Sequence, residues 1–166
     1  MLIQSLTTPT RTLPPLRGRE GRGVREICGS FEKSLIGGGI MKREVIRSDK
    51  APKAIGPYEQ ALKIDGWVFT SGQIPLDPQT GAMVEGGIGA QARQVLENLR
   101  AVLETAGTSM SRVVKATVYM TNLGDFQKMN EVYAEYFPQD KPVRSTVGVA
   151  SLPRGAMVEI DLVAQV

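Results

Sequence analysis

Two helical patterns of apolar residues, separated by strand-like segments, constrain the fold of this chain more than any other feature of its sequence. The first repeats apolar residues at spacings of three and four over 92–106 and ends at Gly107, which suits a left-handed C-terminal cap. The second occupies 126–137, and Pro138 stops it. Each pattern predicts a helix with one apolar stripe, which a sheet or another helix must cover.

The remaining apolar segments have the alternation or composition of β-strands. Asp65-Gly66 separates the runs 59–64 and 67–71, and an Asp-Gly pair between two alternating runs predicts a β-hairpin. Residues 113–120 are rich in β-branched side chains, which favour a strand. Further strands are expected at 44–47, 145–150 and 157–163.

The expected order of elements, a short strand followed by ββαβαββ, predicts an α+β fold. In this fold two helices cover one face of a mainly antiparallel sheet. The strands leave few polar positions for the opposite face, so we expect that face to be apolar and the protein to associate through it. The apolar residues expected there are Val147, Val149, Val158, Ile160 and Leu162.

Two shortages in the composition narrow the chemistry. The chain has no His, which excludes Ser-His-Asp and Cys-His relays and His-ligated zinc, and its single Cys, Cys28, cannot form an internal disulfide. A general base must therefore be a carboxylate, Lys, Tyr or water. No apolar run approaches the roughly 18–20 residues of a membrane span, so we expect no membrane association and a cytoplasmic location.

The excess positive charge lies in residues 1–40, which hold six Lys and Arg against three Glu, whereas the other 126 residues hold 14 basic and 14 acidic side chains. The body therefore lacks the basic surplus typical of nucleic-acid binding. We expect residues 1–40 to be disordered or the product of a false upstream start, because Gly37 to Gly39 just before Met41 resemble a translated ribosome-binding site. The folded domain is expected over 41–166.

Arg144 and Glu159 are the charged residues whose surroundings suggest chemistry. The planar guanidinium of Arg144 suits bidentate binding of a carboxylate or phosphate, although a surface or interface salt bridge is the ordinary explanation. Glu159 interrupts the apolar run 157–160, where burial would raise its pKa and suit it to acid or base catalysis. An outward-facing strand position explains Glu159 equally well, and spacing does not choose between the two.

Three polar residues are further candidates. Tyr58 lies in a loop, where its phenol could donate to a ligand or simply pack. Ser71 ends a strand beside Gly72, which permits close backbone approach, but without His or a neighbouring Lys it is a poor nucleophile. Asn130 lies on the second helix, where an exposed amide is usual. The glycines of 86–89 lack the Lys-Ser/Thr pair of a phosphate loop, so no nucleotide cofactor is predicted.

Several segments of the body carry motifs in the order found in a known family. They are Ile55-Gly56-Pro57-Tyr58, Thr70-Ser71-Gly72-Gln73-Ile74-Pro75, Gln91-Ala92-Arg93-Gln94, Leu96-Glu97-Asn98-Leu99, Pro142-Val143-Arg144-Ser145 and Val158-Glu159-Ile160. Together they closely resemble the RidA/YjgF family of reactive-intermediate (enamine/imine) deaminases. The resemblance covers essentially all of 41–166, and residues 1–40 have no counterpart.

This resemblance implies a chorismate-mutase-like (YjgF-like) fold and a homotrimer, with the sheets around a central barrel and a ligand cleft between each pair of subunits. It implies a hydrolase acting on C=N bonds, a 2-iminobutanoate/2-iminopropanoate deaminase. Its substrates would be 2-aminoacrylate and related 2-imino acids, converted to 2-keto acids and ammonia. Neither a metal nor a cofactor is implied.

The resemblance also implies roles for particular residues. Arg144 would anchor the substrate carboxylate, and Glu159 would position or activate water. Many relatives have Cys where this chain has Thr146, so a thiol role is lost, whereas a backbone role at that position survives. The implied lining of the cleft is Tyr58, Ser71, Asn130 and Thr146.

Two other functions compete with deamination. The first is a ligand-binding or regulatory trimer that holds a stable 2-keto acid in the same cleft without catalysis. The second is an endoribonuclease or translation inhibitor, an activity associated with some relatives. The balanced charge of the body and the lack of His disfavour the second.

Overall fold

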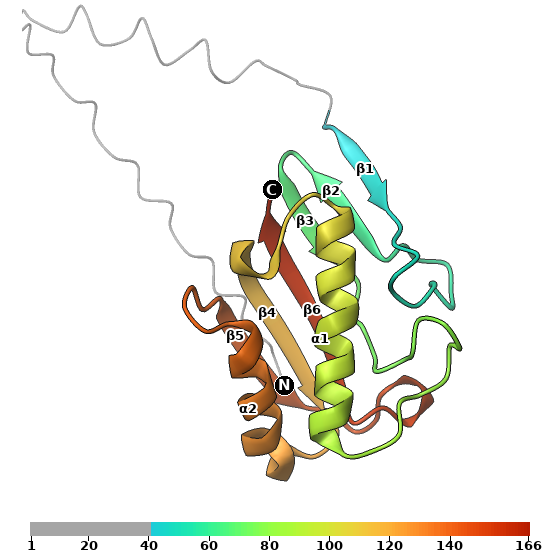
Figure 1. Ribbon diagram of the computed structural model, residues 1–166, viewed down its shortest axis with the longest axis vertical. Helices are drawn as coiled ribbons and strands as arrows, with labels where there is room; N and C mark the ends of the chain where they lie inside the picture. Colours follow the sequence, from blue (N-terminus) through green and yellow to red (C-terminus); the bar gives the residue numbers. More distant parts are fainter. Residues whose placement is uncertain (1–40) are drawn as a thin grey trace, which may run out of the picture. The chain divides into compact units, whose positions relative to one another are not determined.

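A computed structural model describes residues 41–166, so the expectations for residues 1–40 lie outside the described residues (Figure 1). Strands, two long helices and three short 3₁₀ turns follow one another along these residues. They are β1 (Arg43–Ile46), β2 (Ala61–Ile64), β3 (Trp67–Thr70), α1 (Ile88–Thr105), η1 (Met110–Arg112), β4 (Val113–Met120), η2 (Leu123–Asp125), α2 (Phe126–Tyr136), β5 (Val143–Gly148), η3 (Pro153–Gly155) and β6 (Val158–Gln165).

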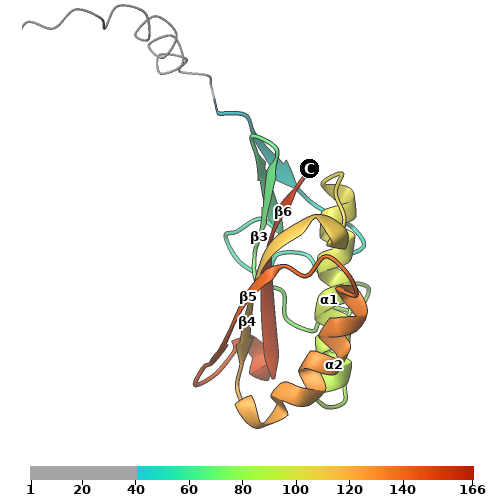
Figure 2. The same ribbon diagram turned by 90° about the vertical axis from the view of Figure 1, so that its left-hand side faces the viewer.

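The predicted order of strands and helices is confirmed, and so is the α+β class. The strands form one six-stranded sheet in the order β1-β2-β3-β6-β4-β5. All neighbours are antiparallel except β4 and β5, which α2 connects as a crossover between parallel strands. Both helices lie on the same side of the sheet (Figure 2). No helix within 41–166 is long and apolar enough to cross a membrane.

The two predicted chain reversals have the backbone conformations that their residues favour. Asp65 and Gly66 have φ angles of 46° and 84°, the pair of left-handed residues that a two-residue hairpin turn requires. Gly107 has φ of 82° and donates its N–H to the Glu104 carbonyl, while Thr108 donates to Leu103. This pair of bonds is a Schellman motif, and it ends α1 where the sequence predicts.

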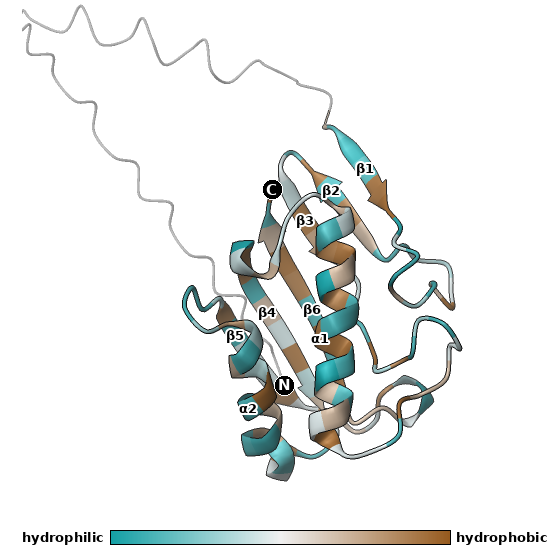
Figure 3. Cartoon of the chain, viewed as in Figure 1, coloured by the Kyte–Doolittle hydropathy of each residue, from teal (hydrophilic) through white to brown (hydrophobic). Residues whose placement is uncertain are grey.

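The core lies between the helices and the sheet, and here one prediction is wrong. Val158, Ile160 and Leu162 are at most 1% exposed and belong to the core under the helices, not to the uncovered face. Successive strand residues alternate between faces, so Glu159 and Asp161 point to the other side. The alternation of apolar and polar residues is visible along β4 in Figure 3.

The uncovered face does carry exposed apolar side chains, on β3, where none was predicted, and on β5, where the prediction for Val147 is correct. Trp67 and Phe69 flank the buried Val68 on β3, so both point away from the helices. Val143 and Val147 do the same on the edge strand β5. The face is therefore apolar at β3 and β5 and acidic along the central strand β6, and association through it stays a prediction.

Candidate active site

A pocket of about 260 Å³ on the uncovered side of the sheet contains the Glu159 carboxylate. We call it the Glu159 pocket. Three loops and the strand β6 form its walls, and its lining is mostly apolar. The lining residues are Ile55, Tyr58, Ser71, Gly72, Ile74, Pro153 and Glu159.

The surroundings of Glu159 favour its protonated form. Burial raises the pKa of its carboxyl above the ordinary value of 4.5, and the negative charge of Asp161, on the same face of β6, raises it further. Within 41–166 no Lys or Arg forms an ion pair with Glu159 that would counter this effect. A carboxyl of this kind suits proton transfer nearer to neutral pH than an exposed glutamate does.

Gly72 is the residue that makes room for this carboxylate. A Cβ atom at position 72 would lie 1.9 Å from Oε1 and 2.8 Å from Cδ of Glu159, far inside contact distance. The carboxylate therefore packs directly on the Gly72 backbone. The close approach predicted at this glycine is confirmed, and its partner is Glu159.

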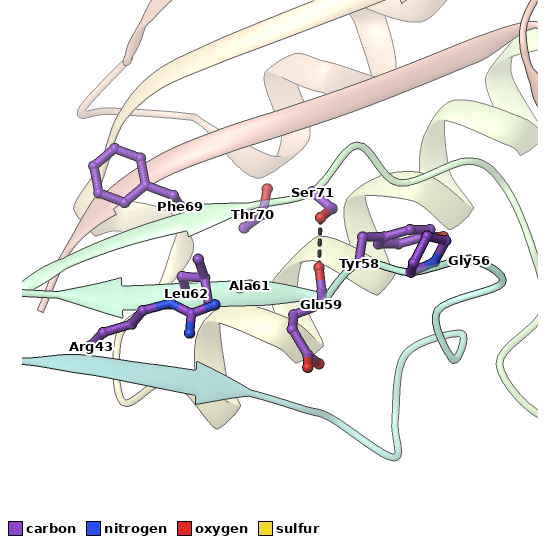
Figure 4. A pocket seen from close by; sticks show the side chains of 10 residues that line it. Arg43, Gly56, Tyr58, Glu59, Ala61, Leu62, Phe69, Thr70 and Ser71 are labelled. Carbon is purple, nitrogen blue, oxygen red and sulfur yellow. Dashed lines mark hydrogen bonds between the residues drawn. The ribbon is translucent and has the colours of Figure 1, made fainter.

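Tyr58 and Ser71 lie beside Glu159, as the sequence predicts. The Tyr58 side chain is half-exposed, and its hydroxyl accepts a hydrogen bond from the Ile55 N–H at 3.3 Å. The Ser71 hydroxyl donates to the Glu59 carbonyl at 2.6 Å (Figure 4). Both hydroxyls are thus hydrogen-bonded to the backbone, and Ser71 has no basic neighbour in the pocket that would activate it as a nucleophile. Ser71 therefore contributes only to the shape of the pocket.

A second and larger hollow, of about 720 Å³, shares Tyr58 and Ser71 with the Glu159 pocket. It extends over β2 and β3, where Leu62 and Phe69 form its apolar floor (Figure 4). Arg43 of β1 lies at its far side. The Glu159 pocket therefore opens onto a broad concave surface on the uncovered face of the sheet.

Arg144 lies in a different setting, which we call the Arg144 cradle: Arg144 with Asn130, Tyr133 and Phe126 of α2. Its Nη2 donates to Asn130 Oδ1 at 2.9 Å. Its Cζ lies 4.4 Å from the centre of the Tyr133 ring and 5.6 Å from that of Phe126. Among the described residues no carboxylate of the same chain pairs with Arg144, so Arg144 forms no salt bridge within one copy. Its remaining N–H groups suit a bound anion.

The sequence identifies Asn130 but misses the two aromatic residues of the cradle. Phe126 and Tyr133 follow the helical spacing of the apolar stripe, which assigns them to the core. The spacing of four and three residues around Asn130 does place all three on one face of α2. Burial raises the Tyr133 pKa to about 12, and within 41–166 its buried hydroxyl has no hydrogen-bond partner.

One chain does not bring the two groups of candidates into one pocket. Arg144 pairs with the buried Ala116, so it points to the helix side at the edge strand β5. Glu159 points to the uncovered side of β6, and β4 lies between the two strands. Thr146 pairs with Val118 on the Arg144 side and does not line the Glu159 pocket. The predicted residues therefore form two half-sites.

The described residues also limit what these half-sites could bind. Within 41–166 no group of three or more Cys, Asp or Glu side chains could hold a metal ion. One half-site offers a guanidinium for an anion, and the other offers a shielded carboxylate for proton transfer. Together they would suit a small anionic substrate that reacts with water.

Comparison with known proteins decides the family. Residues 48–166, which are most of the chain, match the family described as Endoribonuclease L-PSP. The chain belongs to this family. One relative, from Arabidopsis thaliana, is named Reactive Intermediate Deaminase A, chloroplastic, and another, from Mus musculus, is named 2-iminobutanoate/2-iminopropanoate deaminase. The resemblance to the RidA/YjgF family is thereby confirmed.

Members of the L-PSP family from distant organisms are close in sequence to this chain. A RutC family protein of Pyrococcus abyssi is 52% identical over 124 residues, which cover 75% of this chain and 98% of that protein. The 2-iminobutanoate/2-iminopropanoate deaminase of Mus musculus is 46% identical over 122 residues, covering 74% and 90%. A crystal structure of a Rid family protein from Yersinia pestis has 48% identity and a TM-score of 0.74, covering 75% of this chain and 100% of that one.

Proposed function

We propose that the protein hydrolyses reactive 2-imino acids and their enamine forms, such as 2-aminoacrylate, to 2-keto acids and ammonia. The observation that carries this proposal is the Glu159 carboxyl, half-buried in a small apolar pocket with a raised pKa. The family supports it, because a relative with 46% identity is named as such a deaminase. Residues 41–166 would be the catalytic domain, acting in the cytoplasm without metal or cofactor.

We propose further that the active unit is a homotrimer in which neighbouring copies share each site. The Arg144 cradle of one copy would face the Glu159 pocket of the next. The position of the two half-sites on opposite sides of the sheet supports this arrangement, since Arg144 does not line the Glu159 pocket of its own chain. The exposed Trp67 and Phe69 support it as well, because contact between copies would bury them.

In such a shared cleft, Arg144 would bind the substrate carboxylate through two charge-assisted hydrogen bonds. Asn130 already accepts from one of its N–H groups and the Tyr133 ring lies against its plane, so the guanidinium is held before the substrate arrives. Tyr58, Ser71 and Thr146 would complete the lining. Orientation of this kind brings the imine carbon toward the Glu159 carboxylate.

Starting from the protonated imine, the reaction then requires one water and three proton transfers. Glu159 accepts a proton from the water as its oxygen bonds to the imine carbon, which gives a carbinolamine. Glu159 passes the proton to the nitrogen, the C–N bond breaks and ammonia leaves. The hydroxyl proton returns to Glu159 or to water as the keto group forms. A positioned carboxylate contributes roughly 10²- to 10⁴-fold to such a step.

The experiment generates imino acids in situ with an amino-acid oxidase and traps the remaining imine with semicarbazide. Added protein should reduce the semicarbazone signal, and Arg144→Ala should abolish this effect because the carboxylate anchor is lost. Arg100→Ala, on the exposed surface of α1, is the control and should behave as wild type. Wild-type activity in Arg144→Ala would contradict the proposed role of the anchor.

The same experiment separates the competing functions. A ligand-binding trimer would bind 2-ketobutyrate or pyruvate and leave the semicarbazone signal unchanged for small, branched and aromatic substrates. The family description refers to ribonuclease activity, so RNA cleavage should be assayed in parallel. Binding of RNA that weakens steeply with salt would favour that alternative.

A further inference from the structure

Four carboxamide side chains within 41–166 are buried, and three of them bond to backbone distant in the sequence while taking no part in the chemistry proposed above. These three are Gln60, just before β2, and Gln91 and Asn98 on α1, with exposed fractions of 4%, 6% and 1%. Each bonds to the backbone of a different loop, and each of these loops lines the Glu159 pocket. Strand pairing holds the walls of the pocket only at β6 and at the bridge between Gln73 and Ile160, and the rest of the three loops is irregular.

Gln60 holds the loop that carries Ile55 and Tyr58. Its Oε1 accepts from the Ser48 N–H at 2.5 Å, and its Nε2 donates to the carbonyls of Ser48, Ala51 and Pro52 at 2.8–3.3 Å. Its own carbonyl accepts from the Ser71 N–H at 2.9 Å. Gln60 therefore connects the Tyr58 loop to the Ser71 end of β3.

Gln91 and Asn98 hold the other two walls from α1. Gln91 Oε1 accepts from the Met157 N–H at 2.8 Å, two residues before Glu159. Asn98 Nδ2 donates to the Leu76 carbonyl at 2.9 Å, just after Ile74 in the chain. A small cavity of about 20 Å³ between the Tyr58 and Ile74 loops is also lined by Gln60.

We propose that Gln60, Gln91 and Asn98 are positioning residues, which fix the three loops around Glu159 and so set the geometry of the pocket. This inference rests on the proposed deaminase function for its kinetic test. A buried amide without its partner is costly, so each bond confines a loop that would otherwise have several conformations. Displacement of a catalytic group by about 1 Å can cost roughly 10²-fold in rate.

The backbone group that each carboxamide contacts determines whether its oxygen or its NH2 group forms the bond. Met157 offers an N–H and requires an oxygen, whereas the carbonyls of Ser48, Ala51, Pro52 and Leu76 require an N–H. Replacement by the acid, which keeps the shape and removes the donor, should therefore have opposite effects at different sites. Gln91→Glu retains its bond in the first turn of α1, where a carboxylate is favoured. Gln60→Glu and Asn98→Asp would set a carboxylate against carbonyl oxygens.

The test compares kcat/KM for imine hydrolysis well below the melting temperature of each variant. Gln91→Glu should stay within about threefold of wild type, whereas Gln91→Met, Gln60→Glu and Asn98→Asp should lose roughly tenfold or more. Val102→Ala, a core variant of α1 that removes no hydrogen bond, is the control for general destabilisation and should retain activity. Equal losses in Gln91→Glu and Gln91→Met, or an equal loss in Val102→Ala, would overturn the proposal.

Amide hydrogen exchange gives a readout that does not depend on catalysis. Exchange in residues 49–58 should increase in Gln60→Glu and stay unchanged in Gln91→Met and Val102→Ala. This comparison stands even if wild type hydrolyses no imine, an outcome that would refute the proposed function alone. Unchanged exchange of residues 49–58 in folded Gln60→Glu would refute the positioning role.

Discussion

At the scale of the residue, one carboxyl combines two properties that rarely occur together on a strand. Glu159 points to the uncovered face of the sheet, where Asp161 repeats its charge, yet apolar loops shield it. The bare backbone of Gly72 gives it room. The pKa of Glu159 and the position of its carboxylate therefore depend on different neighbours, Asp161 and Gly72. A single substitution at either neighbour tests one property at a time.

The protonation state predicts the pH dependence of activity. Because the pKa of Glu159 is raised, kcat/KM should decline on the acidic side with a midpoint above pH 4.5, where the carboxylate that accepts the proton disappears. Asp161→Asn removes a negative neighbour and should move this midpoint to lower pH. Glu159→Gln should retain binding of 2-ketobutyrate and lose at least about 10²-fold in turnover. If the residual activity of Glu159→Gln declined at low pH with the same midpoint as wild type, a group other than Glu159 would cause that decline.

The raised pKa also has a consequence for stability. A carboxyl whose folded pKa exceeds its unfolded value contributes stability below the unfolded pKa, and this contribution is lost as pH rises through the folded pKa. Glu159→Gln should therefore raise Tm slightly at pH 7, by roughly 1–2 °C after solvent screening is counted, and leave it unchanged near pH 3. Thermal unfolding at the two pH values measures the difference.

The position of the carboxylate is tested at Gly72. Gly72→Ala would place a Cβ 1.9 Å from Glu159 Oε1, so the carboxylate must move and kcat should fall by roughly 10²-fold. Gly89→Ala on α1 is the matched control, because its Cβ would meet only Val132 of α2, at 3.8 Å, which is an ordinary van der Waals distance. That control should gain about 0.5–1 kcal/mol in unfolding free energy without loss of activity. Full activity in Gly72→Ala would contradict the packing described for Glu159.

At the scale of the element, local residue chemistry predicts the helices and the hairpin, because Gly107 and Asp65-Gly66 act within a few residues. The face of β6 is not predictable in the same way. The sequence from Met157 to Ile160 does not indicate which of its residues face the helices. Packing against α1 turns Val158 toward the core and Glu159 toward the uncovered face.

The Arg144 cradle also depends on tertiary packing. The sequence indicates an arginine suited to an anion, whereas its aromatic support comes from α2, a different element. Because β5 is parallel to β4, the connection between them, α2, must cross over the sheet. This crossover brings Asn130 and Tyr133 of α2 into contact with Arg144 on β5. The sequence therefore identifies the members of each half-site but not their separation.

Packing of α2 on β5 is tested at Tyr133. Tyr133→Phe keeps the ring against Arg144 and removes a buried hydroxyl that has no partner in the described residues, so activity should persist and stability should rise by up to about 1 kcal/mol. Tyr133→Leu removes the ring, and KM should rise several-fold because the cation–π contact of roughly 0.5–2 kcal/mol is lost. If Phe raised KM as much as Leu, the hydroxyl and not the ring would hold Arg144.

At the scale of the whole molecule, the central claim is that neighbouring copies share each active site. Two groups of residues with complementary chemistry lie on opposite sides of one sheet, and exposed Trp67 and Phe69 accompany one of them. Within one chain, Arg144 has no general base beside it, and Glu159 has no group beside it that would bind the substrate carboxylate. Each group alone therefore lacks half of the proposed chemistry.

Subunit mixing tests this claim most directly. Arg144→Ala and Glu159→Gln are each expected to be inactive alone, so the two variants are unfolded and refolded together at equal amounts, and size-exclusion chromatography with light scattering verifies the assembly. Random trimers place both intact half-sites in about a quarter of the clefts, so about a quarter of wild-type activity should return. The Arg144→Ala, Glu159→Gln double variant refolded with either single variant should give none. Verified mixed trimers with no regained activity would contradict a shared site.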